Sequence, residues 1–253
     1  SFTYNGVSYE IDTKGVEPKK PVRIIVKYDT QALNGIDPMK LGIYRQDDGN
    51  SLLWVYKGGA VNTKEGTIET WLLSFSRYAV MANEKTFEDI KTHWSRNSIE
   101  VLASRNIING INENEFQPER PITRAEMAKM LIAVLMSDAR KNIRLILPET
   151  QTFEDVKAEE WYYNYVETAA FYGLVKGDNG RLRPDDLITR EEMALMVIRI
   201  LNAEEELSKV SENNLNFNDA NDLSTWAKEA VMLANQKGLV LGDEAGNFNP
   251  KEP

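Results

Sequence analysis

Two hydrophobic patterns divide the chain near residue 84. Before that point, short runs of β-branched and aromatic residues alternate with turn-forming pairs such as Asn34-Gly35 and Gly58-Gly59, which is typical of antiparallel hairpins. The runs cover residues 21–28, 40–46, 51–57, 66–73 and 76–82. We therefore expect an antiparallel β-sandwich over residues 1–84.

The aromatic residues of these runs allow two interpretations. Trp54, Tyr56 and Trp71 could form a platform for a sugar, but the alternation of side chains along a strand favours packing in the core. No activity is predicted for this segment.

After residue 84 the pattern becomes helical, and the sequence repeats. Three Phe-x-Asp motifs occur, with their phenylalanines 66 and 64 residues apart. A tryptophan follows each motif, a glycine stands sixteen residues after the tryptophan, and a proline comes seven or eight residues later. The residues are Phe87, Phe153 and Phe217; Asp89, Asp155 and Asp219; Trp94, Trp161 and Trp226; Gly110, Gly177 and Gly242; and Pro118, Pro184 and Pro250. Such a period predicts a helical repeat architecture, so the predicted fold class is α+β multidomain.

Within each repeat, apolar residues five, eight and thirteen positions after the tryptophan lie on one face of a predicted first helix. This stripe consists of Ile99, Leu102 and Ile107; Val166, Ala169 and Leu174; and Val231, Ala234 and Leu239. The later glycine is expected to relieve a left-handed or tight turn behind that helix. Two residues before each proline, Phe116, Leu182 and Phe248 are expected to anchor the loop by hydrophobic packing.

A second helix is predicted in two of the repeats by a capping motif. Thr123-Arg124-Ala125-Glu126 and Thr189-Arg190-Glu191-Glu192 both fit the S/T-x-x-E capping box. Apolar residues follow at helical spacing, namely Met127, Met130, Leu131, Val134 and Leu135, and Met193, Met196, Val197, Ile200 and Leu201. One helical hairpin of this size buries too little apolar surface to be stable alone, so we expect the copies to pack on each other.

Composition excludes several kinds of chemistry. The net charge of −9 and the absence of clustered Lys and Arg argue against a nucleic-acid partner. The chain has no cysteine, and its single histidine, His93, is expected to be an incidental surface residue. No apolar stretch approaches the roughly 20 residues needed to cross a bilayer. We predict no catalytic residues, no metal, no cofactor and no membrane insertion.

The repeated elements resemble the S-layer homology domain family, whose domains usually occur in threes. The resemblance covers residues 86–253 and includes Phe-x-Asp, the tryptophan, the glycine-rich turn, the proline and Ile-Thr-Arg-x-Glu. The expected domains are a β-sandwich at 1–84 and repeats at 85–150, 151–214 and 215–253. The third repeat lacks its Thr-Arg-x-Glu segment, whose arginine the spacing would place near position 256.

The resemblance implies a fold, a location and a ligand. The fold is a pseudo-threefold assembly of helical hairpins, with grooves between adjacent repeats. The location is extracellular, in the cell wall or S-layer of a Gram-positive bacterium. The ligand is a secondary cell wall polysaccharide carrying an anionic, pyruvylated sugar, which anchors the protein without a covalent bond. The implied glycan-binding residues are Arg124, Arg190, Asp89, Asp155, Trp94, Trp161, Trp226, Gly110 and Gly177.

Each of these residues also has a purely structural interpretation. Arg124 and Arg190 either complete an anion site at a helix N-terminus or form ion pairs with Asp89 or Asp155. The tryptophans either anchor the core or stack on a sugar at a groove rim. The aspartates either form turns and caps or accept hydrogen bonds from sugar hydroxyls.

Two other functions remain open alongside cell wall anchoring. The protein could be part of a surface lattice and associate with itself, or it could belong to a glycan-processing enzyme whose catalytic part lies outside this sequence. The carboxylate pairs Glu159-Glu160 and Asp185-Asp186, and the run 204–206, are interpreted as solvated surface because the sequence does not place them against one another.

Overall fold

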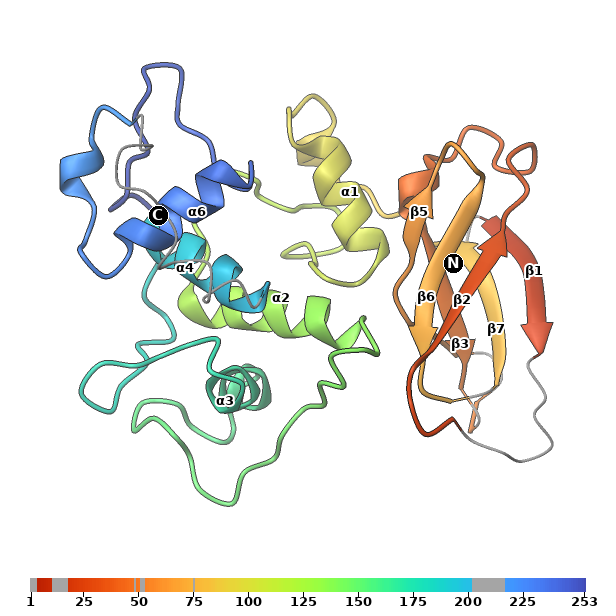
Figure 1. Cartoon of the computed structure of the whole chain (residues 1–253), viewed down its shortest axis with the longest axis horizontal. Coiled ribbons are helices and arrows are strands. Elements are labelled where there is room, and N and C mark those ends of the chain that lie inside the picture. The colour runs from red at the N-terminus through yellow and green to blue at the C-terminus, as the bar shows by residue number, and fades with distance from the viewer. Residues whose placement is uncertain (1–3, 11–17, 48, 51–52, 75, 202–216) are drawn as a thin grey trace. The chain divides into compact units, whose positions relative to one another are not determined.

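A computed structural model describes residues 4–10, 18–47, 49–50, 53–74, 76–201 and 217–253. The predicted run at 204–206 and the residues Ser51, Leu52 and Phe75 lie outside these ranges. The chain forms two compact units (Figure 1). Unit 1 consists of Ser1–Arg120 and Ala133–Ile143, and unit 2 consists of Pro121–Ile132 and Arg144–Pro253.

Unit 1 contains two antiparallel sheets, as the hydrophobic pattern predicts. Sheet A has the strand order β1-β7-β3-β4 and sheet B has the order β2-β6-β5. The strands are β1 (Tyr4–Glu10), β2 (Val22–Lys27), β3 (Leu41–Gln46), β4 (Trp54–Tyr56), β5 (Ala60–Asn62), β6 (Thr67–Leu72) and β7 (Arg77–Ala82). The sequence pattern misses β1 and β5, because neither segment has a run of large apolar residues.

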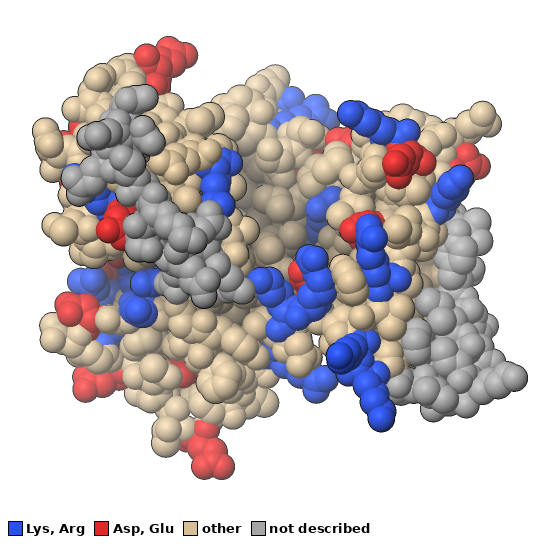
Figure 2. All heavy atoms as spheres, viewed as in Figure 1, with Lys and Arg blue, Asp and Glu red and all other residues tan. Residues whose placement is uncertain are grey.

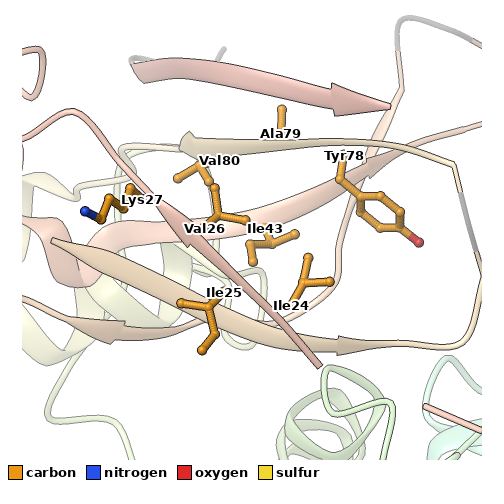
Figure 3. A pocket seen from close by; sticks show the side chains of 8 residues that line it. All are labelled: Ile24, Ile25, Val26, Lys27, Ile43, Tyr78, Ala79 and Val80. Carbon is orange, nitrogen blue, oxygen red and sulfur yellow. The ribbon is translucent and has the colours of Figure 1, made fainter. Parts of the chain in front are cut away.

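The inner faces of the two sheets form one core. Leu41, Ile43 and Val80 of sheet A pack with Ile68 and Leu72 of sheet B. Figure 3 shows the edge of this core, where side chains of β2 lie opposite those of β3 and β7 around a cavity of about 280 Å³.

A buried tyrosine fixes the turn before β7. The Tyr78 hydroxyl donates a hydrogen bond of 2.8 Å to the backbone carbonyl of Ser74, as in the tyrosine corner of immunoglobulin-like sandwiches. The side chain is almost fully buried, so this bond satisfies a polar group inside the sandwich.

The aromatic residues of the strands are found in two environments. Trp54 and Tyr56 pack against Tyr44 and Met81 on the outer face of sheet A, which confirms the packing interpretation for these two. Trp71 instead lies on the outer face of sheet B, where its ring is 5.7 Å from the guanidinium carbon of Arg140.

The predicted helices form in all three repeats. The first helices are α1 (Arg96–Ser104), α3 (Tyr163–Phe171) and α6 (Lys228–Gln236), and the second helices are α2 (Arg124–Met136) and α4 (Arg190–Ile200). Short 3-10 helices are η1 (Pro38–Lys40), η2 (Glu88–Ile90) and η4 (Ala220–Asp222). Both capping boxes are present, because Thr123 and Thr189 exchange hydrogen bonds with Glu126 and Glu192. The fold class α+β is confirmed.

The predicted apolar stripes are largely buried in the first helical segments, but of the residues predicted for the second helices only Met127, Leu131, Leu135 and Met196 are buried. In the first stripes, Leu102 and Leu239 are 36% and 45% exposed, whereas the other seven residues are buried. The helices end before the third position of each stripe, so Ile107, Leu174 and Leu239 lie behind them and not on them as predicted. Val134 in α2 and Leu201, just after α4, are exposed. The innermost positions of the second helices are Ala128, Ile132, Ala194 and Ile198, which are all fully buried and which the predicted stripes did not include.

The prediction for Gly110, Gly177 and Gly242 as helix-ending turn residues is wrong. The left-handed residues behind the first helices are Asn106, Gly173 and Gly238, each twelve positions after its tryptophan. The later glycines are needed for close packing. A Cβ at Gly110 or Gly177 would lie 2.4 or 2.6 Å from the ring of Phe87 or Phe153.

The third repeat packs on the second helix of the repeat before it. Ala194 and Ile198 of α4 share a buried cluster with Ala230, Val231 and Ala234 of α6. Phe248, from the loop after α6, is fully buried in the same cluster. Thus the apolar stripe of α6, which has no second helix of its own repeat in this sequence, is covered by α4.

Candidate functional site: a cationic groove in unit 2

The Phe-x-Asp aspartates hold the loops of the repeats in place. Asp155 accepts hydrogen bonds from the backbone N–H groups of Leu182 and Arg183, at 2.9 and 2.8 Å. The equivalent bonds reach Asp89 from residues 116 and 117, and Asp219 from residues 248 and 249. The three aspartates therefore bind the backbone of a distant loop of their own repeat, a structural role that differs from the predicted turns and caps.

These hydrogen bonds change the acidity of two of the carboxyl groups. Burial raises the pKa of Asp155, but the hydrogen bonds from the N–H groups of Leu182 and Arg183 together lower it by more than burial raises it. The pKa of Asp155 is therefore below its usual value. The pKa of Asp89 is lowered by the same balance of causes. Both carboxylates are thus charged and already hydrogen-bonded at neutral pH.

The two motif arginines make matching contacts with the repeat that follows each of them. The Arg124 Nε donates to the Leu182 carbonyl at 2.8 Å, and its Nη2 lies 3.4 Å from the Lys176 carbonyl. The Arg190 Nε and Nη2 donate to the carbonyls of Phe248 and Leu241, at 2.7 and 3.0 Å. Each arginine therefore docks on the loop of the next repeat.

The contacts of Arg124 differ both from the predicted ion pair with an aspartate and from the predicted anion site at the helix N-terminus. Arg124 forms an ion pair with Glu192 rather than with Asp89 or Asp155. The backbone N–H groups of Arg124 and Ala125 donate to the carbonyls of Asp186 and Pro184. These helix N-terminal donors are therefore used within the fold, and the guanidinium of Arg124 is itself paired with Glu192 and with the carbonyls of Leu182 and Lys176.

A groove with a cavity of about 550 Å³ opens beside Arg124. Its walls come from all three repeats: Arg124 at the start of α2, the loop after α3 together with one face of α4, and Trp226 just before α6. The lining residues are Arg124, Val175, Lys176, Gly177, Asp178, Arg183, Glu192, Leu195, Met196, Arg199 and Trp226.

The charge of this groove is opposite to that of the chain. Basic side chains at positions 124, 176, 183 and 199 outnumber the acidic ones, Asp178 and Glu192. Acidic and basic residues balance over residues 1–84, so the net charge of −9 lies in the repeats that surround the groove. A local cationic site on an acidic module selects for an anionic ligand.

The motif tryptophans are on the surface, so the core-anchor interpretation is wrong. Trp94, Trp161 and Trp226 are 89%, 58% and 54% exposed. At the start of α6 the packing role belongs instead to the next residue, Ala227, which is fully buried. A flat, exposed indole at a groove suits the face of a sugar ring.

Three of the predicted site residues line this groove: Arg124, Gly177 and Trp226. The other six predicted residues, Arg190, Asp89, Asp155, Trp94, Trp161 and Gly110, do not line it. Their proposed contact with a glycan stays a prediction.

Sequence reasoning missed several residues of the groove. Arg183 and Arg199 replace uncharged residues at the matching positions of the first repeat, Gln117 and Ala133. A comparison of the repeats for charges unique to one copy would have indicated these two positions.

Other surfaces of the described residues offer less chemistry. A second hollow of about 510 Å³ in the third repeat is lined by Asp219, Asp222, Lys251 and Glu252, together with Asn247, Asn249 and Pro250, and its acidic side chains do not suit an anion. In unit 1, Lys and Arg side chains gather over β2 and β6 (Figure 2).

Within the described ranges, no group of three or more acidic or histidine residues could hold a metal ion, and no helix is long and apolar enough to span a bilayer.

The repeats match a known family. The S-layer homology domain model matches residues 86–128, 152–194 and 216–253. Residues 86–253 therefore belong to the S-layer homology domain family, as three domains preceded by a β-rich region. Domains of this family anchor surface proteins to the cell wall, which places the protein at the cell surface and implies binding to a cell wall polymer.

Several known proteins are similar to this chain. An amylopullulanase of Thermoanaerobacterium thermosulfurigenes is 38% identical over 85% of the chain, which covers 11% of that protein. Exoglucanase XynX of Acetivibrio thermocellus is 37% identical over 71% of the chain and 16% of its own length. The surface-layer 125 kDa protein of Lysinibacillus sphaericus is 28% identical over 63% of the chain and 13% of its own length. The chain thus spans less than a fifth of these relatives.

Proposed function

We propose that this chain is a noncatalytic anchor that binds an anionic, pyruvylated secondary cell wall polysaccharide in the groove beside Arg124. The observation that carries the proposal is the cationic lining of that groove within an acidic module. The exposed indole of Trp226 at the same groove adds a surface on which a sugar ring can stack.

The ion pair with Glu192 affects how a ligand would bind. The side chains of Arg124 and Glu192 are only 13% and 23% exposed, so the pair holds the guanidinium in a fixed orientation. A ligand carboxylate has to share this guanidinium with Glu192. Lys176 and Arg183 line the same groove and supply further positive charge.

Retention on purified cell walls tests the proposal. Wall material that carries the pyruvylated polymer should retain the protein, and depyruvylated material should not. Arg124→Ala should weaken retention and Arg124→Ala with Arg190→Ala should weaken it further. Arg23→Ala, on β2, controls for the loss of one positive charge, because this side chain lies outside the groove. Retention that is unchanged by depyruvylation would contradict the role of Arg124.

A second candidate concerns the protein to which this anchor belongs. The amylopullulanase and exoglucanase similarities favour a surface glycoside hydrolase whose catalytic part lies outside this chain. The surface-layer relative favours a lattice protein that associates with itself. Release of reducing sugar by the full-length protein would support the hydrolase, whereas ordered arrays in electron micrographs would support the lattice.

A further inference from the structure

Helix α1 of the first repeat contacts the β-sandwich inside unit 1. We propose that this contact is a specific docking interface between sheet A and the first repeat, so that the β-sandwich and the first repeat fold as one unit. The interface rests on three polar contacts and on differences between the repeats.

The first contact is a buried ion pair. The Lys40 Nζ, at the end of η1, lies 2.7 Å from Glu100 Oε2 of α1. The two side chains are only 11% and 6% exposed. The Glu100 carboxylate also accepts a hydrogen bond of 2.7 Å from Thr86 Oγ1. Arg96 of the same helix also pairs with Glu100, at 2.8 Å, whereas the other acidic neighbour of Lys40, Glu84, is 3.8 Å away. Lys40 therefore depends on this contact more than Glu100 does.

The second and third contacts satisfy backbone carbonyls. The Tyr44 hydroxyl donates to the carbonyl of Ser104 at 3.0 Å, and both residues are almost fully buried. Ser104 is the last residue of α1, where carbonyl groups have no partner within the helix. In the opposite direction, the Arg105 Nη2 donates to the carbonyl of Met39 at 2.7 Å.

Only the first repeat carries all three residues that this interface uses. At the positions of Glu100, Ser104 and Arg105, the second repeat has glutamate, phenylalanine and tyrosine, and the third has methionine, glutamine and lysine. Phe171, which matches Ser104, is 71% exposed in its own repeat. A phenylalanine at position 104 would place a ring in the space that Tyr44 fills.

The buried strands of sheet A agree with this assignment. When one face of a sheet is exposed to solvent, buried and exposed side chains alternate along each strand, and β6 shows this alternation. In β3, by contrast, four consecutive residues are buried, and one of them, Tyr44, is on the outer face of sheet A. The similarity to the amylopullulanase covers 220 residues, more than residues 86–253 contain, so it extends into the β-rich region. The contacts of Lys40, Tyr44 and Arg105 hold the sandwich on the first repeat in addition to the backbone link at residues 83–85.

Hydrogen exchange followed by mass spectrometry on the full chain tests the interface. Ser104→Phe, which gives the first repeat the residue of the second, should accelerate amide exchange about tenfold or more in both α1 and β3. The reciprocal control, Phe171→Ser, should leave exchange in these elements unchanged. If Ser104→Phe does not fold, Tyr44→Phe removes one hydrogen bond and should accelerate the same two elements to a smaller extent.

A substitution remote from the interface separates docking from cooperative folding. Ile68 is fully buried in a core cluster that contains no residue of α1. Ile68→Ala should accelerate exchange in α1 as well as in the strands. Exchange in α1 that stays at the wild-type rate in Ile68→Ala, or exchange in β3 that stays at that rate in Ser104→Phe and Tyr44→Phe, would overturn the proposal.

Discussion

The charge on Glu100 should make the stability of unit 1 depend on pH. Burial raises the pKa of this carboxyl, but hydrogen bonds from Lys40, Arg96 and Thr86 lower it more, to about 2 from a usual value of 4.5. Because the pKa is lower in the folded state, the ionised group stabilises the fold above pH 4.5. This contribution is lost as the pH falls from 4.5 towards 2.

Glu100→Gln measures the size of this effect. The pKa difference corresponds to at most about 3 kcal/mol of unfolding free energy at neutral pH. The variant also leaves the Lys40 cation with Glu84, at 3.8 Å, as its remaining acidic partner among the described residues. We therefore expect the variant to lose about 2–3 kcal/mol at pH 7 and progressively less below pH 4.5.

Urea unfolding at pH 7 and pH 3 provides the assay, with hydrogen exchange in α1 to identify the transition of unit 1. The control is Glu167→Gln in the second repeat. Glu167 is equally buried but accepts hydrogen bonds from the backbone and hydroxyl of Thr152, without a basic partner among the described residues. A loss for Glu100→Gln that is the same at both pH values, or no larger than that of the control, would refute the reasoning.

Three further predictions concern unit 2. Gly177→Ala should cost about 2–3 kcal/mol in urea unfolding, because its Cβ would collide with Phe153; Gly173→Ala, at φ +71° with open space around it, should cost about 1 kcal/mol. Trp226→Ala should weaken retention on pyruvylated wall polymer and change the unfolding free energy by less than about 1 kcal/mol, because the indole is 54% exposed. Asp155→Asn should lose about 1–2 kcal/mol at pH 7, and the loss should shrink below the usual carboxyl pKa of 3.8 because the wild-type pKa lies lower still. Equal costs for the two glycines, a Trp226→Ala protein that unfolds early, or a pH-independent loss for Asp155→Asn would contradict these predictions.

The sequence by itself determined the local elements and their order. Alternating β-branched runs indicated the strands, and the capping boxes at Thr123 and Thr189 indicated where α2 and α4 begin. These features depend on neighbouring residues, so local spacing is enough to predict them. The repeated motif also identified the family, because one pattern recurred three times.

Only the tertiary structure decided which partner each motif residue has. Glu192 pairs with Arg124 from the repeat before it, and the groove collects residues that lie up to about a hundred positions apart along the chain. The same holds for Lys40 and Glu100, which are 60 residues apart. Packing between helices and sheets sets these contacts. Hydrophobic periodicity shows which face of a helix is buried, but not which residue lies against that face.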